Sequence, residues 1–268
     1  MLEARGLRLA LGGAEVLRGV DLAVRPGEVL ALVGPNGAGK SSLLACLSGA
    51  LRPTGGAVSM DGESPRALSP EALARRRAVL EQSPEGAGGF ALSALVSLAI
   101  PREIPPARAE AIMAEALSAV GLSALAARPL HALSGGERHR GHMARALAQH
   151  LAGRETGQGR WLLLDEPTAS LDLAHQAAAL RAARRAAERG AGVLAVLHDL
   201  SLAAAMADRV ALLVAGRIVA EGAPEAVLTP ERLAAIYGLP VHVAQLSGAL
   251  SITPLYREPQ GDAPCSSR

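Results

Sequence analysis

The feature that most constrains the fold is a glycine-rich loop placed between an apolar run and a segment of helical spacing. Val29–Val33 (VLALV) is continuously apolar, which is typical of a strand buried on both faces. GPNGAGKSS follows from Gly34 to Ser42, and Lys40–Leu51 has helical spacing. The loop fits G-x-x-x-x-G-K-[ST], in which backbone N–H groups surround phosphate oxygens. Because a strand precedes the loop and a helix follows it, we expect a phosphate-binding loop rather than a chance glycine turn.

The residues of this loop have distinct expected roles. Lys40 would reach the β- and γ-phosphates, and the hydroxyl of Ser41 would ligate Mg²⁺. The remaining positions would contact the nucleotide through their backbone; they are Gly34, Pro35, Asn36, Gly37, Ala38, Gly39 and Ser42. The expected ligands are therefore phosphate groups and Mg²⁺.

A second apolar strand ends in two acids. WLLLDEP, from Trp161 to Pro167, delivers Asp165 and Glu166 at its tip. Asp165 could contact Mg²⁺, and Glu166 could orient or deprotonate an attacking water. An ordinary pair of strand-end acids would have the same pattern. The phosphate loop in the same chain favours the functional interpretation.

Two further polar residues follow expected strands. VLAVLHDLS, residues 193–201, places His198 at a strand tip, where it could contact a γ-phosphate. Gln82 follows an expected strand at 77–81 and could ligate Mg²⁺ or sense the nucleotide. A lone histidine in such a place is also typical of a structural or merely exposed residue, and Gln82 alone carries little information.

LSGGE, which begins at Leu133, predicts a second anion site. Ser134 can cap a helix, and Glu137, three residues later, can complete a capping box. Gly135 and Gly136 leave the first backbone N–H groups approachable, and helix N-termini of this kind attract phosphate. The chain therefore has two expected phosphate contacts far apart in sequence.

The order of expected elements indicates an α/β fold. The 268 residues suffice for one large domain or two small ones. Strands alternate with helices outside the middle of the chain, as in layered α/β cores. The middle is alanine-rich and interrupted by prolines, which predicts an inserted helical subdomain. We expect a core from residues 1–82 and 151–222, the helical subdomain at 83–150, a polar loop at 153–160, and a C-terminal helical segment and tail at 223–268.

Composition limits the partners. The net charge of +2 gives no strongly basic face, so we expect no nucleic-acid partner. The short arginine runs at 75–77 and 184–185 are typical of solvated helix faces. Neither of the two cysteines is expected in a disulfide or metal site. The N-terminus has no signal-peptide pattern, and the apolar run at 88–100 is too short to cross a bilayer. We expect a soluble chain that could still dock on a membrane protein.

Together these motifs carry a family resemblance. GPNGAGKSS, Gln82, LSGGE, LLLDEPTASLD and His198 occur in the order and approximate spacing of the ATP-binding cassette (ABC) ATPases, so residues 1–240 resemble that family. The resemblance implies a P-loop NTPase core similar to RecA, a helical subdomain that carries LSGGE, and a head-to-tail homodimer that closes over two ATP molecules.

The resemblance also implies roles for the site residues. Mg²⁺ would be held by Ser41, Gln82 and Asp165. Glu166 would activate water, with Lys40 and His198 contacting the γ-phosphate. The LSGGE motif would hold the ATP bound to the partner's phosphate loop, through Ser134, Gly135, Gly136 and Glu137. Residues 170–172 would cross the dimer interface.

Within the family, the chain resembles the ATPase subunits of importers. These work at the cytoplasmic face of the cell membrane, beneath two integral-membrane permease subunits and, indirectly, a periplasmic substrate-binding protein. The group that serves ferric siderophores, cobalamin and haem is the most similar. His175-Gln176, the 153–160 insert and the RWLLLDEP start favour the haem branch. Siderophore or cobalamin import, a cassette ATPase without a transport role, and an inactive regulatory module stay open as alternatives.

Some positions depart from the family pattern. Leu11 stands where many members stack adenine on an aromatic ring, with Val16 nearby, so we expect weak discrimination between ATP and GTP. Gly141 and His142 replace apolar residues of the signature helix, which we expect to weaken that helix. Phe90 and Leu92 are candidates to hold a helix of the membrane partner, and plain helix packing is the alternative.

Overall fold

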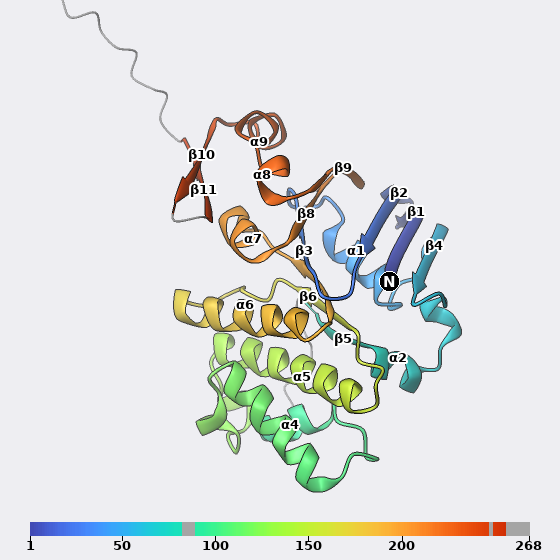
Figure 1. Ribbon diagram of the computed structural model, residues 1–268, viewed down its shortest axis with the longest axis vertical. Coiled ribbons are helices and arrows are strands. Elements are labelled where there is room, and N and C mark those ends of the chain that lie inside the picture. The colour runs from blue at the N-terminus through green and yellow to red at the C-terminus, as the bar shows by residue number, and fades with distance from the viewer. Residues whose placement is uncertain (82–88, 247–248, 256–268) are drawn as a thin grey trace, which may run out of the picture.

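A six-stranded sheet forms the centre of the fold in the computed structural model, which describes residues 1–81, 89–246 and 249–255 (Figure 1). Its strand order is β5-β6-β7-β3-β8-β9. The strands are β5 (Arg77–Leu80), β6 (Trp161–Asp165), β7 (Gly192–Val196), β3 (Val29–Val33), β8 (Arg209–Val214) and β9 (Arg217–Gly222). All neighbours pair in parallel except β8 and β9, which are antiparallel. The carboxyl ends of the parallel strands therefore meet at one edge.

A three-stranded antiparallel sheet packs beside the central sheet. Its order is β2-β1-β4, with β1 (Leu2–Leu11), β2 (Ala14–Val24) and β4 (Gly55–Met60). The alternation of side chains along β3 explains why this strand is apolar throughout. Leu30 and Leu32 join the core shared with this second sheet, whereas Val29, Ala31 and Val33 face the core beneath the helices.

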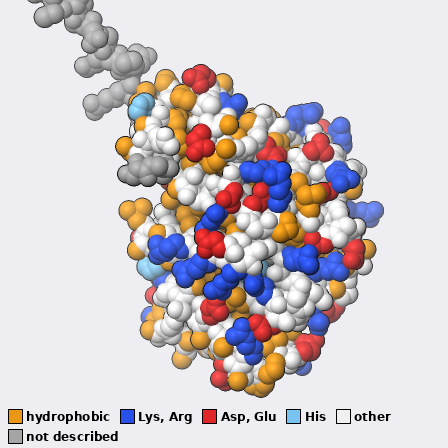
Figure 2. All heavy atoms as spheres, in the orientation of Figure 1, with side chains coloured by type: hydrophobic (Ala, Val, Ile, Leu, Met, Phe, Trp, Pro, Cys, Tyr) orange, Lys and Arg blue, Asp and Glu red, His pale blue; other side chains and the backbone are white. Residues whose placement is uncertain are grey.

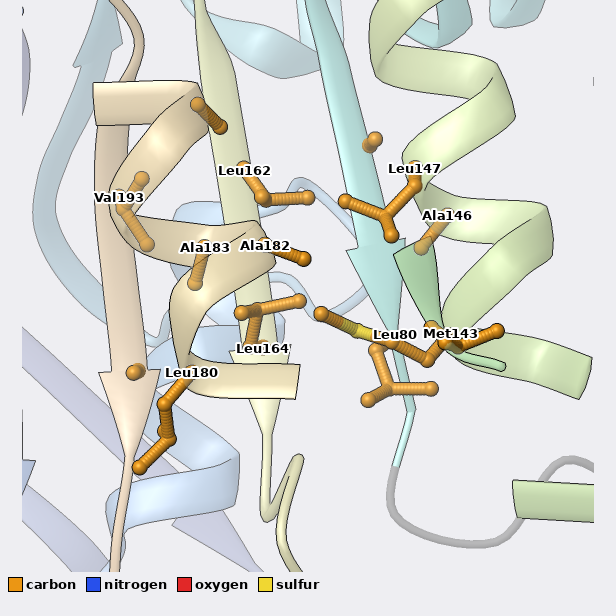
Figure 3. Close-up of a cluster of buried hydrophobic side chains, with 14 of the residues drawn as sticks. Leu80, Met143, Ala146, Leu147, Leu162, Leu164, Leu180, Ala182, Ala183 and Val193 are labelled. Carbon is orange, nitrogen blue, oxygen red and sulfur yellow. The ribbon is translucent and has the colours of Figure 1, made fainter. Parts of the chain in front are cut away.

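Helices cover the sheets. The core helices are α1 (Lys40–Leu47), α2 (Pro70–Arg76), α6 (Leu173–Glu188), α7 (Leu200–Met206), α8 (Pro224–Val227) and α9 (Pro230–Tyr237). The helical part between β5 and β6 holds α3 (Leu92–Ser97), α4 (Pro106–Ala119) and α5 (Gly135–Glu155), with short 3₁₀ turns at Ser123–Leu125 and Leu130–Ala132. A further 3₁₀ turn, Pro65–Ala67, lies between β4 and α2. Figure 3 shows α5 and α6 packing apolar side chains against β5, β6 and β7. The predicted α/β fold class is confirmed.

Three local expectations were wrong. Residues 153–155, expected in a loop, belong to α5, which also runs across the boundary expected after residue 150. The helix expected at 40–51 ends at Leu47, because Gly49 turns the chain with φ +82°. The C-terminal segment, expected as helices and a tail, begins with the helices α8 and α9 but continues in an unexpected hairpin, β10 (Val241–Leu246) and β11 (Ala249–Pro254), which lies against α7.

In the part of the chain that the structure describes, no helix is both long enough and apolar enough to span a bilayer.

Candidate functional site

The glycine-rich loop leaves the end of β3 and enters α1. Gly34 has φ +147°, and a side chain there would clash with the backbone of Leu213 on β8. Gly39 caps α1 in the left-handed region with φ +102°. Both positions therefore require glycine. With glycines there, the loop can bend so that its backbone N–H groups surround an open space in front of α1.

Lys40 lies at the first position of α1 with its amine folded back on the loop. The side chain is buried, and Nζ donates to the carbonyl oxygens of Gly34 at 2.8 Å and Pro35 at 2.9 Å. Burial lowers the pKa of Lys40, and the nearby carboxylates of Asp165 and Glu166 partly oppose this shift. The amine is thus positioned to exchange loop carbonyls for phosphate oxygens.

Asp165 ends β6 and is 4% exposed. Its carboxylate lies beside the Ser41 hydroxyl, and burial raises the pKa of Asp165. Its Oδ1 has no hydrogen-bond partner among the described residues. Buried polar atoms without a partner are costly, and a carboxylate beside a hydroxyl offers the oxygen ligands that Mg²⁺ prefers. Ser41 and Asp165 therefore fit a divalent cation.

Glu166 and His198 come together because β6 and β7 are neighbours. Oε1 of Glu166 lies 2.6 Å from Nε2 of His198. Glu166 has φ +52°, in the left-handed region that a glutamate rarely adopts. Its backbone N–H donates to the carbonyl of Val196 at 3.2 Å, and the ring of His139 on α5 lies near the backbone of Glu166 and Pro167. Strain retained in this way is typical of functional sites.

Lys40, Glu166 and His198 line one cavity of about 760 Å³, whereas the buried Asp165 is not part of its lining. The cavity brings together most of the phosphate loop, Glu166 and His198; the lining residues are Val16, Asn36, Gly37, Gly39, Lys40, Ser41, Ser42, Glu166 and His198. Val16 was only a secondary candidate from the sequence, whereas Leu11 is 44% exposed and does not line this cavity. Gln82, the third expected metal ligand, lies outside the described residues.

The LSGGE segment forms the capping box that its sequence predicted. The Ser134 hydroxyl accepts from the Glu137 N–H at 3.2 Å, and the Glu137 carboxylate accepts from the Ser134 N–H at 2.7 Å. The second bond lowers the pKa of Glu137. Neither residue lines the cavity of the chain's own phosphate loop. The helix N-terminus of α5 therefore leaves its first N–H groups available for an anion held elsewhere.

The ABC transporter family model matches residues 17–169, which run from β2 through the phosphate loop and LSGGE to the acids after β6. The chain belongs to the ABC transporter family. Its relatives include three proteins named "Hemin import ATP-binding protein HmuV". That of Rhodopseudomonas palustris is 46% identical and covers 90% of each chain. That of Myxococcus xanthus is 47% identical and covers 98% of each, and that of Streptomyces coelicolor is 48% identical over 96% of this chain and 90% of its own.

Solved structures agree with this family. The ATP-binding subunit of an ABC transporter superposes with a TM-score of 0.76 at 25% identity, covering 90% of this chain and 95% of its own. A putative metal-chelate type ABC transporter in an inward-facing conformation superposes with a TM-score of 0.75 at 26% identity, covering 96% and 98%. The chain is thus an ABC ATPase cassette, and it covers nearly the full length of these proteins.

The packing of α3 against α5 explains one departure from the family pattern, Gly141, and decides one docking candidate, Leu92. Leu92, a candidate for an exposed docking residue, is fully buried, so this prediction was wrong. It packs against Gly141, where an added Cβ would lie 2.8 Å from Leu92 Cδ1. Gly141 therefore makes room for α3 against α5, rather than merely weakening the helix. Phe90 remains 61% exposed.

Proposed function

We propose that this ABC cassette hydrolyses ATP to drive haem import across the cytoplasmic membrane. The observation that carries the proposal is the 46–48% identity, over nine-tenths or more of this chain, to three proteins named for hemin import. The phosphate loop, Glu166 and His198 around one cavity support the hydrolytic part of the proposal.

Each side chain would have a definite part in hydrolysis. Lys40 would release its two loop carbonyls and bind the β- and γ-phosphates. Glu166 would accept a proton from the attacking water, and His198, 2.6 Å away, would orient that carboxylate and contact the γ-phosphate. Ser41, Asp165 and Gln82 would hold Mg²⁺, which neutralises charge on the phosphates when bound.

The capping box of α5 would complete the site of a second copy. Ser134, Gly135, Gly136 and Glu137 lie outside the cavity of their own phosphate loop. The capping box uses the N–H groups of Ser134 and Glu137, so those of Gly135 and Gly136 suit an anion. In a head-to-tail homodimer they would contact the ATP held by the partner subunit. ATP would then favour the closed dimer, because only the closed form makes these contacts.

The membrane partner would dock near Phe90. A groove of about 520 Å³ lies between α2, α3 and α5, and its lining includes Arg75, Leu98, His142 and Arg145. Leu98 is 77% exposed. Leu98 lines the groove directly after α3, and Phe90 is exposed two residues before α3; exposed apolar side chains of this kind are typical of a protein-binding surface. Two permease subunits would dock here, at the cytoplasmic face of the membrane, and a periplasmic binding protein would deliver the cargo from the other side.

Growth on defined iron sources tests the cargo. A strain that lacks this chain is offered haem, a ferric siderophore or simple iron salts as its only iron source. We expect growth to fail on haem alone and to be restored by the wild-type chain but not by Glu166→Gln. Failure on the siderophore with intact haem use would move the cargo to that alternative, and cobalamin uptake is measured in parallel. Growth on every source would contradict an import role and favour a cassette ATPase without transport.

A further inference from the structure

A groove of about 480 Å³ lies between α4, α5 and α6, and none of its lining residues lines the phosphate-loop cavity. Its floor is apolar, with Leu147 and Leu151 from α5 and Ala178 and Ala182 from α6. The volume is in the range of small-molecule sites, and apolar floors with a few polar groups are typical of them. The hydrolysis mechanism uses none of these residues.

Arginines surround this groove. Arg181 and Arg185 lie four positions apart on α6, Arg189 follows at the C-cap of this helix, and Arg154 adds a fourth guanidinium from α5. A band of Lys and Arg side chains crosses Figure 2 where Figure 1 places these two helices. Like charges at this spacing repel each other and destabilise a helix, so this row of arginines lowers the stability of the protein when no ligand is bound.

Few carboxylates lie close enough to neutralise the four arginines of this groove. Arg189 pairs with Glu115 at 2.7 Å, the one carboxylate of the lining. Arg154 donates to the backbone carbonyl of Arg189 rather than to an acid. Within the described ranges, Arg154, Arg181 and Arg185 have no carboxylate within ion-pair distance. Four arginines against one glutamate leave three positive charges at the groove.

His150 in the groove wall supplies an independent observation. It is 3% exposed, and neither ring nitrogen has a hydrogen-bond partner in the described part of the chain. Burial and the charges of Arg154 and Arg189 lower the pKa of His150 to about 4, so the ring is neutral near pH 7. An unpartnered buried polar ring is costly, and a ligand group can supply the partner that the fold lacks.

We propose that this groove binds an organic dianion, a molecule with two carboxylate or phosphate groups on an apolar body. The guanidinium groups of Arg181 and Arg185 would bind the charged ends, since arginine matches the planar geometry of carboxylate and phosphate. The apolar body would lie on the alanines and leucines of the floor. The site is separate from the phosphate loop, and the proposal does not depend on which cargo is imported.

Calorimetric titration of the nucleotide-free protein tests the site with two probes. Sebacate is a flexible aliphatic dicarboxylate, and protoporphyrin IX is a dicarboxylate on a wide apolar ring. The double variant Arg181→Gln/Arg185→Gln should weaken binding by about tenfold or more, since hydrogen bonds to charged groups are the strong ones. Arg184→Gln is the matched control, because Arg184 is on the same helix but pairs with Asp208 outside the groove. It should change binding by less than about twofold.

Nitrogen NMR of histidine-labelled protein supplies a second readout. Bound dianion should shift the ring signals of His150 and leave those of exposed His131 in place. Tighter binding of the porphyrin would identify a ring dicarboxylate as the ligand, and tighter binding of sebacate an aliphatic one. The proposal is overturned if neither probe binds at millimolar concentration, if the double variant binds as well as the wild type, or if Arg184→Gln loses as much affinity.

Discussion

Oε1 of Glu166 and Nε2 of His198 lie 2.6 Å apart, although 32 positions separate the two residues in the chain. The pair exists because β6 and β7 are parallel neighbours, so that their carboxyl ends present both side chains at one edge. Glu166 adopts φ +52° there, a conformation that costs a non-glycine residue about 1–3 kcal/mol. This strained backbone places the Glu166 carboxylate in the same cavity as the phosphate loop.

Glu166→Gln should separate ATP binding from hydrolysis. The amide keeps the size of the side chain but cannot accept a proton, so turnover should fall at least about a hundredfold. ATP should still bind, because Lys40 and the loop are unchanged, and the variant should accumulate as an ATP-bound dimer. Phosphate release and light scattering measure the two effects. Turnover at the wild-type rate would refute the assignment of Glu166 as the base.

Ser134→Ala should have a stability effect and a separate functional effect. Loss of an N-cap hydroxyl costs about 1 kcal/mol of unfolding free energy. Ser69→Ala is the control, because the Ser69 hydroxyl caps α2 by accepting from the Ala72 N–H at 3.2 Å. Both variants should lose similar stability in denaturant titrations, but only Ser134→Ala should weaken ATP-dependent dimerisation. Equal dimerisation of the two variants would mean that Ser134 is a structural cap alone.

The sequence predicts local motifs well and distant contacts poorly. Gly34 to Ser42 could be assigned from sequence because the chemistry needs adjacent backbone N–H groups. The 2.6 Å contact between Glu166 and His198 depends on the order of strands in the sheet, and a local sequence pattern cannot predict that order. Leu92 could be given from sequence either as a docking residue or as plain helix packing, and its contact with Gly141, 49 positions away, decides for packing. The β10–β11 hairpin was missed because Val241–Leu246 alternates only weakly between apolar and polar residues.

His150→Leu should make the protein less sensitive to acid. The pKa of His150 is lowered to about 4 in the folded state, from 6.5 for an unperturbed histidine. Between these values the unfolded chain binds more protons, so stability falls as the pH drops. The penalty at pH 5 is about 2 kcal/mol. The difference in unfolding free energy between pH 7.5 and pH 5 should shrink by this amount in His150→Leu, and an unchanged difference would contradict a buried, neutral His150.

Nucleotide selectivity should be weak. Leu11 is half-exposed and outside the cavity, and Val16 is the apolar side chain that lines it. Neither offers the aromatic stacking that is worth about 1–3 kcal/mol per base. The kcat/KM values for ATP and GTP should therefore differ by less than about tenfold, or about 1.4 kcal/mol. A larger preference for ATP in steady-state assays would point to a base contact that these residues do not supply.

Phe90→Asp should uncouple the ATPase from the membrane partner without unfolding it. The Phe90 ring is 61% exposed, and the fold uses the residue mainly through its carbonyl, which accepts from the Leu130 N–H at 2.9 Å. A charge on this apolar surface should prevent docking of the membrane partner, because the carboxylate would be buried without a partner. Val219→Asp is the control, since Val219 is 51% exposed on β9, away from the groove.

Four measurements decide this last prediction, two on the isolated chain and two on the complex. The ATPase rate of the isolated chain and its thermal midpoint should stay within the range of the wild type for Phe90→Asp and Val219→Asp. Co-purification with the membrane subunits and uptake in cells should be lost only in Phe90→Asp. Normal uptake by Phe90→Asp would exclude this surface as the docking site. Equal loss in Val219→Asp would mean that any added exposed charge disturbs the complex, so that the position near α3 has no special role.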